Sequence, residues 1–529
     1  MSPSGWKDWM IVMKRPDAKI GSHRVGVFLA TIGFFPSPRA SRSKGMCVRN
    51  GGSVETTRPR CAGAASLAFM SGVARVFFTP KLLSLLLPLL GLFGCSSSQA
   101  PKAAAPAKPL FTPPPGVLTN APAPKPATSG GPIMLGIDVL EADGFNVVKG
   151  KRLGLLTHPA GVNRRGVSTI EVLRKAPGVK LVALFGVEHG VNNEFPAGKN
   201  YNSYLDPRTG LQVFSLYDGK SRKPTKAQLK GLDAVVVDLQ DIGTRSYTFI
   251  SAMKLAAEAC FENGVELIIL DRPNPLGGLK ADGPPLDAAL SVNNYVGAFR
   301  VPYVHGLTMG ELARMAHEAP GVLAIPDAVR QKGQLTVVPM RGWSRAMRWT
   351  ETGLTWVPTS PKMQDFSAVM GYPMTGLGCE PPSGFRHGVG DQYAFRGLSH
   401  MTAKIDVYEK ELRALQLPGI QFRRVSAPNA RTGQPAIGLF VEITDWAEWH
   451  PAELNFWLLK LACKLEGKNP FTPAKLNEKT IFVRLMGSAA FANDLVAKGA
   501  QVDIDAWLRT WRAQAKVYQE QSKKYWLYR

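Results

Sequence analysis

The sequence contains little cysteine. Six cysteines occur among 529 residues, and no two of them form a CxxC pair. Three lie in the first 95 residues, which leaves Cys260, Cys379 and Cys463 for the rest of the chain. An odd number without metal-type spacing indicates neither a disulfide framework nor a zinc site. Cys260 and Cys463 fall within helical patterns, so we expect both to be small buried side chains.

Several motifs that mark common enzyme sites are also missing. No GxGxxG follows the first predicted strand and no P-loop occurs, so a site that cradles phosphate groups is unsupported. No GxSxG elbow is present, which weakens the case for an acyl-transfer hydrolase. From these absences we expect no bound cofactor.

Acidic residues are scarce relative to basic ones. The chain has 64 Lys and Arg but 40 Asp and Glu, which gives a formal net charge of +24. Such an excess suits an anionic glycan, a nucleic acid or lipid headgroups. A nucleic-acid partner would require a basic stripe with interleaved aromatic residues, and the sequence has none. We therefore expect no nucleic-acid partner, and a solvated basic surface is the simpler interpretation.

The longest apolar run is too short to span a membrane. Residues 82–93 follow Arg75 and Lys81 and end in LFGC, which resembles a bacterial lipobox. This order predicts a lipoprotein signal peptide over residues 70–94 and a lipidated Cys95. The interpretation places the protein on the periplasmic face of a bacterial envelope membrane, with Ser after the cysteine favouring the outer membrane.

The segments on either side of this signal lack the patterns of a folded domain. Residues 1–69 have no sustained periodicity, and we interpret them as a mis-called upstream extension. Residues 95–132 are rich in Ala, Pro and Lys and are predicted to be a tether.

The chain beyond the tether begins with alternating strands and helices. Four short apolar runs occupy residues 152–158, 181–190, 233–241 and 265–275, and helical patterns occupy 168–176 and 244–264. Continuous apolar runs are typical of strands buried on both faces. Their alternation with helices predicts a doubly wound α/β domain, which we place at residues 133–300.

A second, smaller α+β domain is predicted over residues 301–529. Its predicted elements are a helix at 305–321, a strand at 437–445, and helices at 451–467 and 504–524. Thr308 and Glu311 have the spacing of a capping box at the start of the first helix.

Each of the four predicted strands ends in polar residues. These are Thr157 and His158, Glu188 and His189, Asp238, Gln240 and Asp241, and Asp271, Arg272 and Asn274. Ligands of open α/β sheets bind beyond the carboxyl ends of the strands, so we expect these residues to share a crevice. Carboxylates beside a cation and amides suit glycosidic cleavage. A metal held by Asp238, Asp241 and His189 is the alternative.

Segments from residue 135 to the terminal KKYWLYR carry a specific resemblance. They include FGVEHG (185–190), SLYDGKSRKPT (215–225), VVDLQDIGTRSYTFISAM (236–253), LDRPNPLGG (270–278), HGLTMGELARM (305–315), GWSRAM (342–347), TGLTWVPTSP (352–361) and LMGSAAF (485–491). With these motifs the chain resembles the NamZ family of exo-β-N-acetylmuramidases.

The resemblance implies a fold and an activity. The fold is a Rossmann-like domain joined to a smaller C-terminal domain, with the active site in the cleft between them. The activity is release of N-acetylmuramic acid from the non-reducing end of peptidoglycan fragments, such as MurNAc-GlcNAc and muropeptides. It requires no metal.

The resemblance also assigns residues. Glu188 is implied as the general acid/base, with His189, Asp238 and Asp241 beside it in the catalytic set. Gln240, Arg245, Tyr247, Asp271, Arg272, Asn274, Asp282 and Glu380 are the implied substrate-binding residues. Arg272 is our first choice for the lactyl carboxylate of muramic acid, because an arginine can bind a carboxylate with two parallel hydrogen bonds.

The chain departs from the family pattern in two segments. ADGPP (281–285) has Asp282 where the family has a longer carboxylate, and the 377–392 segment LGCEPPSGFRHGVGDQ is altered. Glu380 takes the position of the first carboxylate in the family's loop, whereas His387 and Val389 occupy the positions of an expected Glu and Arg. A non-catalytic muropeptide-binding lipoprotein is therefore the alternative function.

Structural interpretations remain open for several of these residues. Asp238 and Asp241 have the positions of turn-forming residues, and Asp271 is placed to brace a turn against Arg272. A third functional class, an esterase or deacetylase, would use the same carboxylates with a metal.

Overall fold

The computed structural model describes residues 132–529, except residues 197 and 478. The predictions for residues 1–69, for the signal peptide at 70–94 and for Cys95 lie outside the described residues. Within the described part, no helix combines the length and the apolar character needed to cross a membrane.

The main sheet of the described chain has seven strands in the order β3-β4-β2-β1-β5-β6-β9. The strands are β1 (Arg152–Thr157), β2 (Lys180–Gly186), β3 (Tyr204–Leu205), β4 (Gln212–Ser215), β5 (Ala234–Asp238), β6 (Glu266–Leu270) and β9 (Leu335–Val338). All neighbours pair in parallel except β3 with β4. Without β3, the chain order across the sheet is 3-2-1-4-5-6, that of a Rossmann fold. The predicted doubly wound α/β fold is confirmed.

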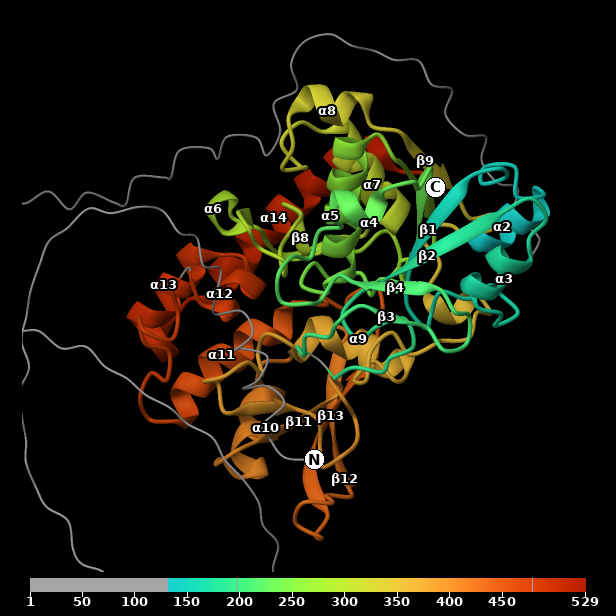
Figure 1. Ribbon diagram of the computed structural model, residues 1–529. Helices are drawn as coiled ribbons and strands as arrows, with labels where there is room; N and C mark the ends of the chain where they lie inside the picture. Colours follow the sequence, from blue (N-terminus) through green and yellow to red (C-terminus); the bar gives the residue numbers. More distant parts are fainter. Residues whose placement is uncertain (1–131, 197, 478) are drawn as a thin grey trace, which may run out of the picture. The chain divides into compact units, whose positions relative to one another are not determined.

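Helices connect these strands. They are α2 (Gly136–Ala142), α3 (Thr169–Lys175), α4 (Lys226–Leu229), α5 (Phe249–Asn263), α6 (Ala288–Ser291), α7 (Met309–Glu318) and α8 (Asp327–Lys332). Figure 1 shows α2 and α3 gathered on one side of β1 and β2, with α5 and α7 on the other. Because both faces are covered, β5 is buried along its whole length.

Local sequence signals set the ends of two of these helices. The Thr308 side chain accepts a hydrogen bond from the backbone N–H of Glu311, and the predicted capping box at the start of α7 is confirmed. Gly264 ends α5 in the left-handed region, with φ of 67°, where a residue without Cβ is favoured.

A second, antiparallel sheet has the order β10-β11-β13-β12. Its strands are β10 (Phe385–His387), β11 (Gly397–His400), β12 (Ile420–Ala427) and β13 (Ala436–Ile443). The helices of this region are α9 (Phe366–Thr375), α10 (Ile405–Ala414), α11 (Glu453–Leu465), α12 (Ile481–Met486), α13 (Ala489–Lys498) and α14 (Ile504–Ser522). Short 3-10 turns occur at Trp349–Glu351, Gly499–Gln501 and Lys523–Tyr525. The predicted smaller α+β region is confirmed.

The predicted boundary between the domains at residue 300 is wrong. The segment after it contains α7, α8 and β9, and β9 pairs in parallel with β6. A two-stranded sheet also joins β7 (Asp282–Pro285) to β8 (Pro302–Val304) across the expected boundary. The sequence LTVV of β9 is short and only partly buried, so it lacks the long apolar run that identified the other strands.

The carboxyl-terminal residues return to the first sheet. The Tyr528 hydroxyl donates a hydrogen bond to Asp271 Oδ2 at 2.6 Å and accepts one from the backbone N–H of Met340 at 2.9 Å. Its ring packs edge-on against Trp343, with 5.0 Å between centroids. The two sheets are therefore joined at the chain end as well as by the segment between them.

Candidate active site

Glu188 lies two residues beyond the carboxyl end of β2, and its side chain is 6% exposed. Its Oε1 accepts a hydrogen bond from the backbone N–H of Gly198 at 2.8 Å, and its Oε2 accepts one from the Thr248 hydroxyl at 3.2 Å. Thr248 directly precedes α5, so the carboxylate is held between the loop after β2 and the start of a helix. The prediction that β2 delivers Glu188 to a buried position at the sheet edge agrees with this geometry.

His189 continues the same tight turn. Its φ is 76°, in the left-handed region that non-glycine residues rarely adopt. The ring Nδ1 lies 2.9 Å from the carbonyl oxygen of Phe195, which fixes the orientation of the imidazole. A ring held in this way is suited to orient its neighbours, and its place in the catalytic set stays a prediction.

Tyr372 in α9 is sensitive to the charges of three carboxylates. Burial raises the pKa of Tyr372, and the negative charges of Glu380, Glu188 and Asp241 raise it further. Tyr247 has a similar environment, since its pKa is raised by burial and then by Asp241 and Glu188. Glu188 and Asp241 therefore influence both tyrosines, whereas Glu380 influences Tyr372.

Asp241 follows β5 and is 7% exposed. Its Oδ2 accepts a hydrogen bond from the backbone N–H of Gly243 at 2.8 Å, and Nε2 of His305 lies 3.3 Å away. Its Oδ1 is buried and has no hydrogen-bond partner among the described residues. Asp241 is thus partly a turn former, as the structural interpretation proposes, but retains one oxygen that can accept a hydrogen bond from a ligand.

Glu380 lines a closed cavity of about 10 Å³, together with Ser246, Tyr303 and Tyr372. The Ser246 hydroxyl donates to the Tyr303 hydroxyl at 3.2 Å and lies 3.2 Å from the Tyr372 hydroxyl. A cavity of this volume is large enough for about one water molecule. Burial raises the pKa of Glu380 to about 8, so the carboxyl group is mostly neutral at pH 7.

Asp238 and Arg272 form a buried ion pair away from this group. Arg272 Nε lies 2.5 Å from Asp238 Oδ1, and Nη2 lies 2.9 Å from Oδ2. The same Nη2 donates to the carbonyl oxygen of Val162 at 2.6 Å, and the Thr169 hydroxyl donates to Asp238. Both side chains are almost fully buried. The guanidinium that we expected to bind the lactyl carboxylate already binds an internal carboxylate.

His158 and Gln240 complete this second group. His158 Nε2 accepts a hydrogen bond from the backbone N–H of Gln240 at 2.9 Å, which requires that nitrogen to be unprotonated. Burial holds the pKa of His158 well below its usual range, and the charges of Arg272 and His189 lower it further. The Gln240 amide donates to the carbonyl oxygens of Asp241 and Pro273. His158 Nδ1 is buried without a hydrogen-bond partner among the described residues, so the group is only partly satisfied.

Several other predicted sugar ligands have the contacts of structural residues. Asp271 is fully buried and accepts hydrogen bonds from the Thr308 hydroxyl, the Gly310 N–H and Tyr528. The Asn274 amide donates to the carbonyl oxygen of Leu307. These contacts favour the structural interpretation of Asp271, although its partner is Tyr528 rather than Arg272.

Arg245 and Asp282 join the two regions of the fold. Arg245 is fully buried, and its Nη2 donates to the carbonyl oxygen of Met486 at 3.0 Å. Burial lowers the pKa of Arg245 to about 10. Asp282 Oδ2 accepts a hydrogen bond from the backbone N–H of Ala452 at 2.8 Å. Neither contact involves a group that faces Glu188, so their assignment to substrate binding stays a prediction.

Sequence reasoning missed the aromatic residues around Glu188. Tyr217 follows β4, a strand that the sequence did not indicate because QVFS is short and mixed in polarity. Burial raises the pKa of Tyr217, and the charge of Glu188 raises it further. SLYDGKSRKPT did mark this segment, and the rule that ligands lie at strand ends would have selected Tyr217 once β4 was known.

The altered loop is built into the second sheet. His387 in β10 stacks on Phe395 with 4.0 Å between ring centroids, and burial lowers its pKa to about 4. Val389 is fully buried in an apolar cluster with Val425 and Ala427. Val389 therefore packs in the interior, whereas His387 is half-buried, and Glu380 is the carboxylate that this loop contributes.

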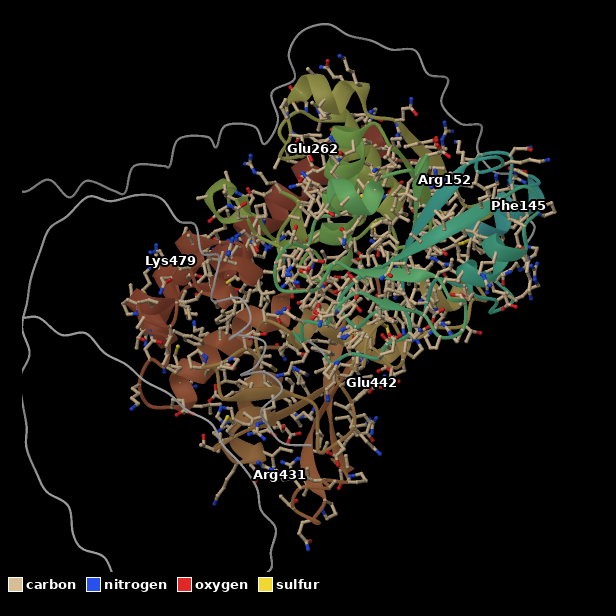
Figure 2. All side chains as sticks on the ribbon, in the orientation of Figure 1. Phe145, Arg152, Glu262, Arg431, Glu442 and Lys479 are labelled. Atoms are coloured by element: carbon tan, nitrogen blue, oxygen red, sulfur yellow. The ribbon has the colours of Figure 1, made fainter. Side chains whose placement is uncertain are left out.

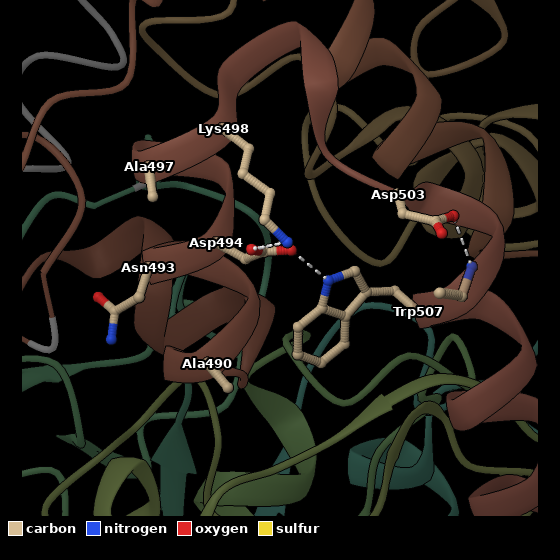
Figure 3. Close-up of a pocket in the computed structure, with 8 residues that line it drawn as sticks. Ala490, Asn493, Asp494, Ala497, Lys498, Asp503 and Trp507 are labelled. Carbon is tan, nitrogen blue, oxygen red and sulfur yellow. Dashed lines mark hydrogen bonds and ion pairs between the residues drawn. The ribbon is translucent and has the colours of Figure 1, made fainter. Parts of the chain in front are cut away.

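A more open groove of about 620 Å³ lies between α13 and α14 (Figure 3). Trp507 donates from Nε1 to Asp494 Oδ2 at 2.9 Å in its wall, and Lys498 pairs with the same carboxylate. None of the predicted site residues lines this groove. We therefore place the candidate active site at Glu188 and not here.

The charged surface is mixed in sign. Exposed Arg152 in β1, Glu262 in α5, and Arg431 and Lys479 in turns are labelled at separate places in Figure 2. In the part of the chain that the structure describes, no group of three or more His, Cys, Asp or Glu is placed to hold a metal ion.

Family models match the chain in two parts, which correspond to the two regions of the fold. Residues 153–367 match the family described as "Exo-beta-N-acetylmuramidase NamZ, N-terminal", and residues 370–528 match its C-terminal counterpart. The chain belongs to the NamZ family. The resemblance read from the motifs is confirmed, and the join between the two NamZ domains falls near residue 368, well beyond the predicted boundary.

Individual relatives of this chain support its assignment to the NamZ family. It is 40% identical over 331 residues to "Peptidoglycan beta-N-acetylmuramidase NamZ" of Bacillus subtilis (strain 168), covering 62% of this chain and 77% of the relative. The crystal structure of a DUF1343 family protein from Bacteroides fragilis NCTC 9343 is similar with a TM-score of 0.65 and 34% identity. That match covers 75% of this chain and 99% of the other. A second DUF1343 protein of that organism, 23% identical with a TM-score of 0.54 and the same coverages, shares the fold.

The buried ion pair generates a stability prediction. We expect Arg272→Met to lower the free energy of unfolding by about 3–5 kcal/mol, because it leaves the Asp238 carboxylate buried without its cation. Arg341→Met, which removes an exposed partner of Asp143, should cost less than about 1 kcal/mol. Urea denaturation measures both. A fully stable Arg272→Met variant that loses substrate affinity would contradict the structural assignment and return Arg272 to the sugar subsite.

The raised pKa of Glu380 predicts a pH dependence. Its folded pKa of about 8 lies above the ordinary value of 4.5 for a glutamate, so its stabilising contribution is complete below pH 4.5 and is lost as the pH rises toward 8. We expect Glu380→Gln to abolish that loss and to gain stability relative to wild type by on the order of 2–4 kcal/mol between pH 5 and pH 8. Denaturation at both pH values tests this, with Glu442→Gln as control. A pH-independent difference would show that Glu380 is ionised in the fold.

Proposed function

We propose that this protein is an exo-acting glycoside hydrolase that releases N-acetylmuramic acid from the non-reducing end of peptidoglycan fragments in cell-wall turnover. The observation that carries the proposal is the buried Glu188 carboxylate beyond the end of β2, which Gly198 and Thr248 hold by hydrogen bonds. The Bacillus subtilis relative, whose name specifies a peptidoglycan β-N-acetylmuramidase, supports the substrate class.

Glu188 is the proposed proton donor to the leaving glycosidic oxygen. Hydrogen bonds from Gly198 and Thr248 fix its carboxyl group in one orientation, which lowers the entropic cost of reaching the reactive geometry. The buried Tyr217 beside it limits access of water. Asp241, with one unpartnered oxygen, is the proposed second carboxylate, which stabilises positive charge as it develops on the sugar ring.

A non-catalytic muropeptide-binding lipoprotein is the second candidate. It is favoured by the altered loop, in which the half-buried His387 and the buried Val389 occupy the positions of an expected Glu and Arg. The presence of Glu188, Asp241 and Glu380, whose charges all influence Tyr372, supports the hydrolase instead. Release of a chromogenic aglycone from a β-MurNAc glycoside by the wild-type protein separates the two.

The acid/base role of Glu188 predicts a specific kinetic defect. Glu188→Gln keeps the shape of the side chain but cannot donate the proton, so kcat on MurNAc-GlcNAc should fall by roughly 10²–10⁴-fold. A substrate with an activated leaving group needs no protonation and should recover much of the lost rate. Affinity for free MurNAc should be retained.

Glu194→Gln is the matched control for this experiment. Glu194 is an exposed carboxylate in the same loop that hydrogen-bonds Asn192 and Tyr204. Its substitution should leave kcat unchanged. Near wild-type hydrolysis of the natural disaccharide by Glu188→Gln would show that the role is misassigned, and Asp241 would be the next carboxylate to test.

We further propose that residues 70–94 direct export and that lipidated Cys95 anchors the protein on the periplasmic face of the envelope, in the outer membrane. The order of basic Arg75 and Lys81, a short apolar segment and then LFGC supports this. Cys95→Ser should shift the protein from the membrane fraction to unprocessed or released forms and leave muramidase activity intact. Mass spectrometry of the mature terminus and fractionation measure this. Membrane retention of Cys95→Ser at the wild-type level would argue against the anchor.

A further inference from the structure

Arg222 lies beside the candidate active site, and no carboxylate pairs with it in the described part of the chain. It follows β4 in the SLYDGKSRKPT segment, and among the described residues no carboxylate lies within ion-pair distance of it. Its neighbours are engaged elsewhere, since Lys223 pairs with Glu258 and Glu262. The Nη1 of Arg222 is buried and has no hydrogen-bond partner in this part of the chain. A buried donor left unpaired is costly, which indicates that a ligand supplies the acceptor.

Two tyrosines hold the Arg222 guanidinium. Its central carbon lies 3.7 Å from the centroid of the Tyr217 ring and 4.6 Å from that of Tyr295. The two rings stand at 63° to each other, so together they cover the planar group from two directions. Aromatic contacts of this kind stabilise a cation and fix its plane. The in-plane N–H groups are then left to bind a ligand, and they match a planar carboxylate.

A second unpartnered donor lies at the same place. The Tyr295 hydroxyl is buried and has no hydrogen-bond partner among the described residues. Because Arg222 rests on the Tyr295 ring, both unpaired groups belong to one small cluster. Two hydrogen-bond donors and a positive charge, with no acceptor between them, match the two oxygens of a carboxylate.

Tyr217 connects this cluster to Glu188. Its ring carries Arg222 on one face. Gly186 of β2 pairs with Ser215 of β4, so Glu188 and Tyr217 each lie two residues beyond a paired position of neighbouring parallel strands. The cation therefore lies on a tyrosine that follows the strand next to that of the proposed proton donor. A sugar whose glycosidic oxygen contacts Glu188 would bring a substituent of the same ring to Arg222.

We propose that Arg222 and Tyr295 form the subsite that binds the lactyl carboxylate of muramic acid. This inference rests on the proposed function, which supplies a substrate with one carboxylate on a sugar ring. It replaces Arg272, whose guanidinium is occupied by Asp238 and Val162. Tyr217 positions Arg222 and separates it from Glu188, so the substrate carboxylate and the reacting carboxyl group do not compete for the same cation.

The test compares a chromogenic β-MurNAc glycoside with its lactyl methyl ester, which has the same ring and no charge. Arg222→Met should lower kcat/KM on the acid by about 10- to 100-fold, mainly through KM, because a hydrogen-bonded charge pair is lost. The loss on the methyl ester should be less than about 3-fold. Tyr295→Phe keeps the ring under Arg222 and should give a smaller loss, about 3- to 10-fold, that is again confined to the acid.

Control variants separate charge recognition from folding. Lys220→Met removes an exposed cation from the same loop and should change neither substrate's kcat/KM. Arg222→Lys keeps the charge but lacks the planar fork, so it should recover only part of the loss on the acid. Equal losses of kcat/KM on acid and ester in Arg222→Met would overturn the proposal, because Arg222 would then act through packing alone.

Calorimetric binding of free MurNAc distinguishes this inference from the proposed function. If wild type binds MurNAc, Arg222→Met does not, and no protein hydrolyses the chromogenic glycoside, the subsite stands and the hydrolase assignment fails. If wild type hydrolyses the acid and ester glycosides equally well, the hydrolase stands and the subsite fails. A wild-type protein that neither binds MurNAc nor cleaves the glycoside overturns both.

Discussion

The buried pair of Asp238 and Arg272 determines where a ligand can bind. Asp238 ends β5 beside β1, at the point where the strand order of a doubly wound sheet reverses and a crevice normally opens. Arg272 and Thr169 fill that position and satisfy the carboxylate. An ion pair buried this completely is stable only when its geometry and remaining hydrogen bonds are good, so the position is not available to a substrate.

With that crevice closed, the site lies over β2 and β4 and requires the second region of the chain. Glu188 comes from the loop after β2, whereas Tyr372 and Glu380 come from the segment that leads into the second sheet. The hydrogen bonds from Arg245 to Met486 and from Ala452 to Asp282 tie the two regions together through buried atoms. The relative placement of the three carboxylates thus depends on contacts that lie outside the site itself.

The sequence predicted the strands that are long and apolar, because burial on both faces leaves a continuous signal in β1, β2, β5 and β6. It did not reveal β4 or β9, which are short and partly exposed, and this displaced the domain boundary and hid Tyr217. The rule that ligands bind at strand ends selected Glu188 and Asp241 together, and their roles stay predictions. It could not show that Asp238 is bound by Arg272, 34 residues further along, because such pairing is set by sheet order and not by local pattern.

An anionic sugar faces an electrostatic difficulty in a site that contains three carboxyl groups. Like charges a few ångströms apart in a poorly solvated site repel by several kcal/mol. Burial raises the pKa of Glu380 to about 8, so at neutral pH that group is mostly uncharged and adds little to the repulsion. Arg222 lacks an internal carboxylate that would cancel its charge, so it offsets the repulsion at the point where the anion is proposed to bind. A fully paired Arg222 would satisfy the resting protein better, but it would leave the substrate's carboxylate without a counter-charge.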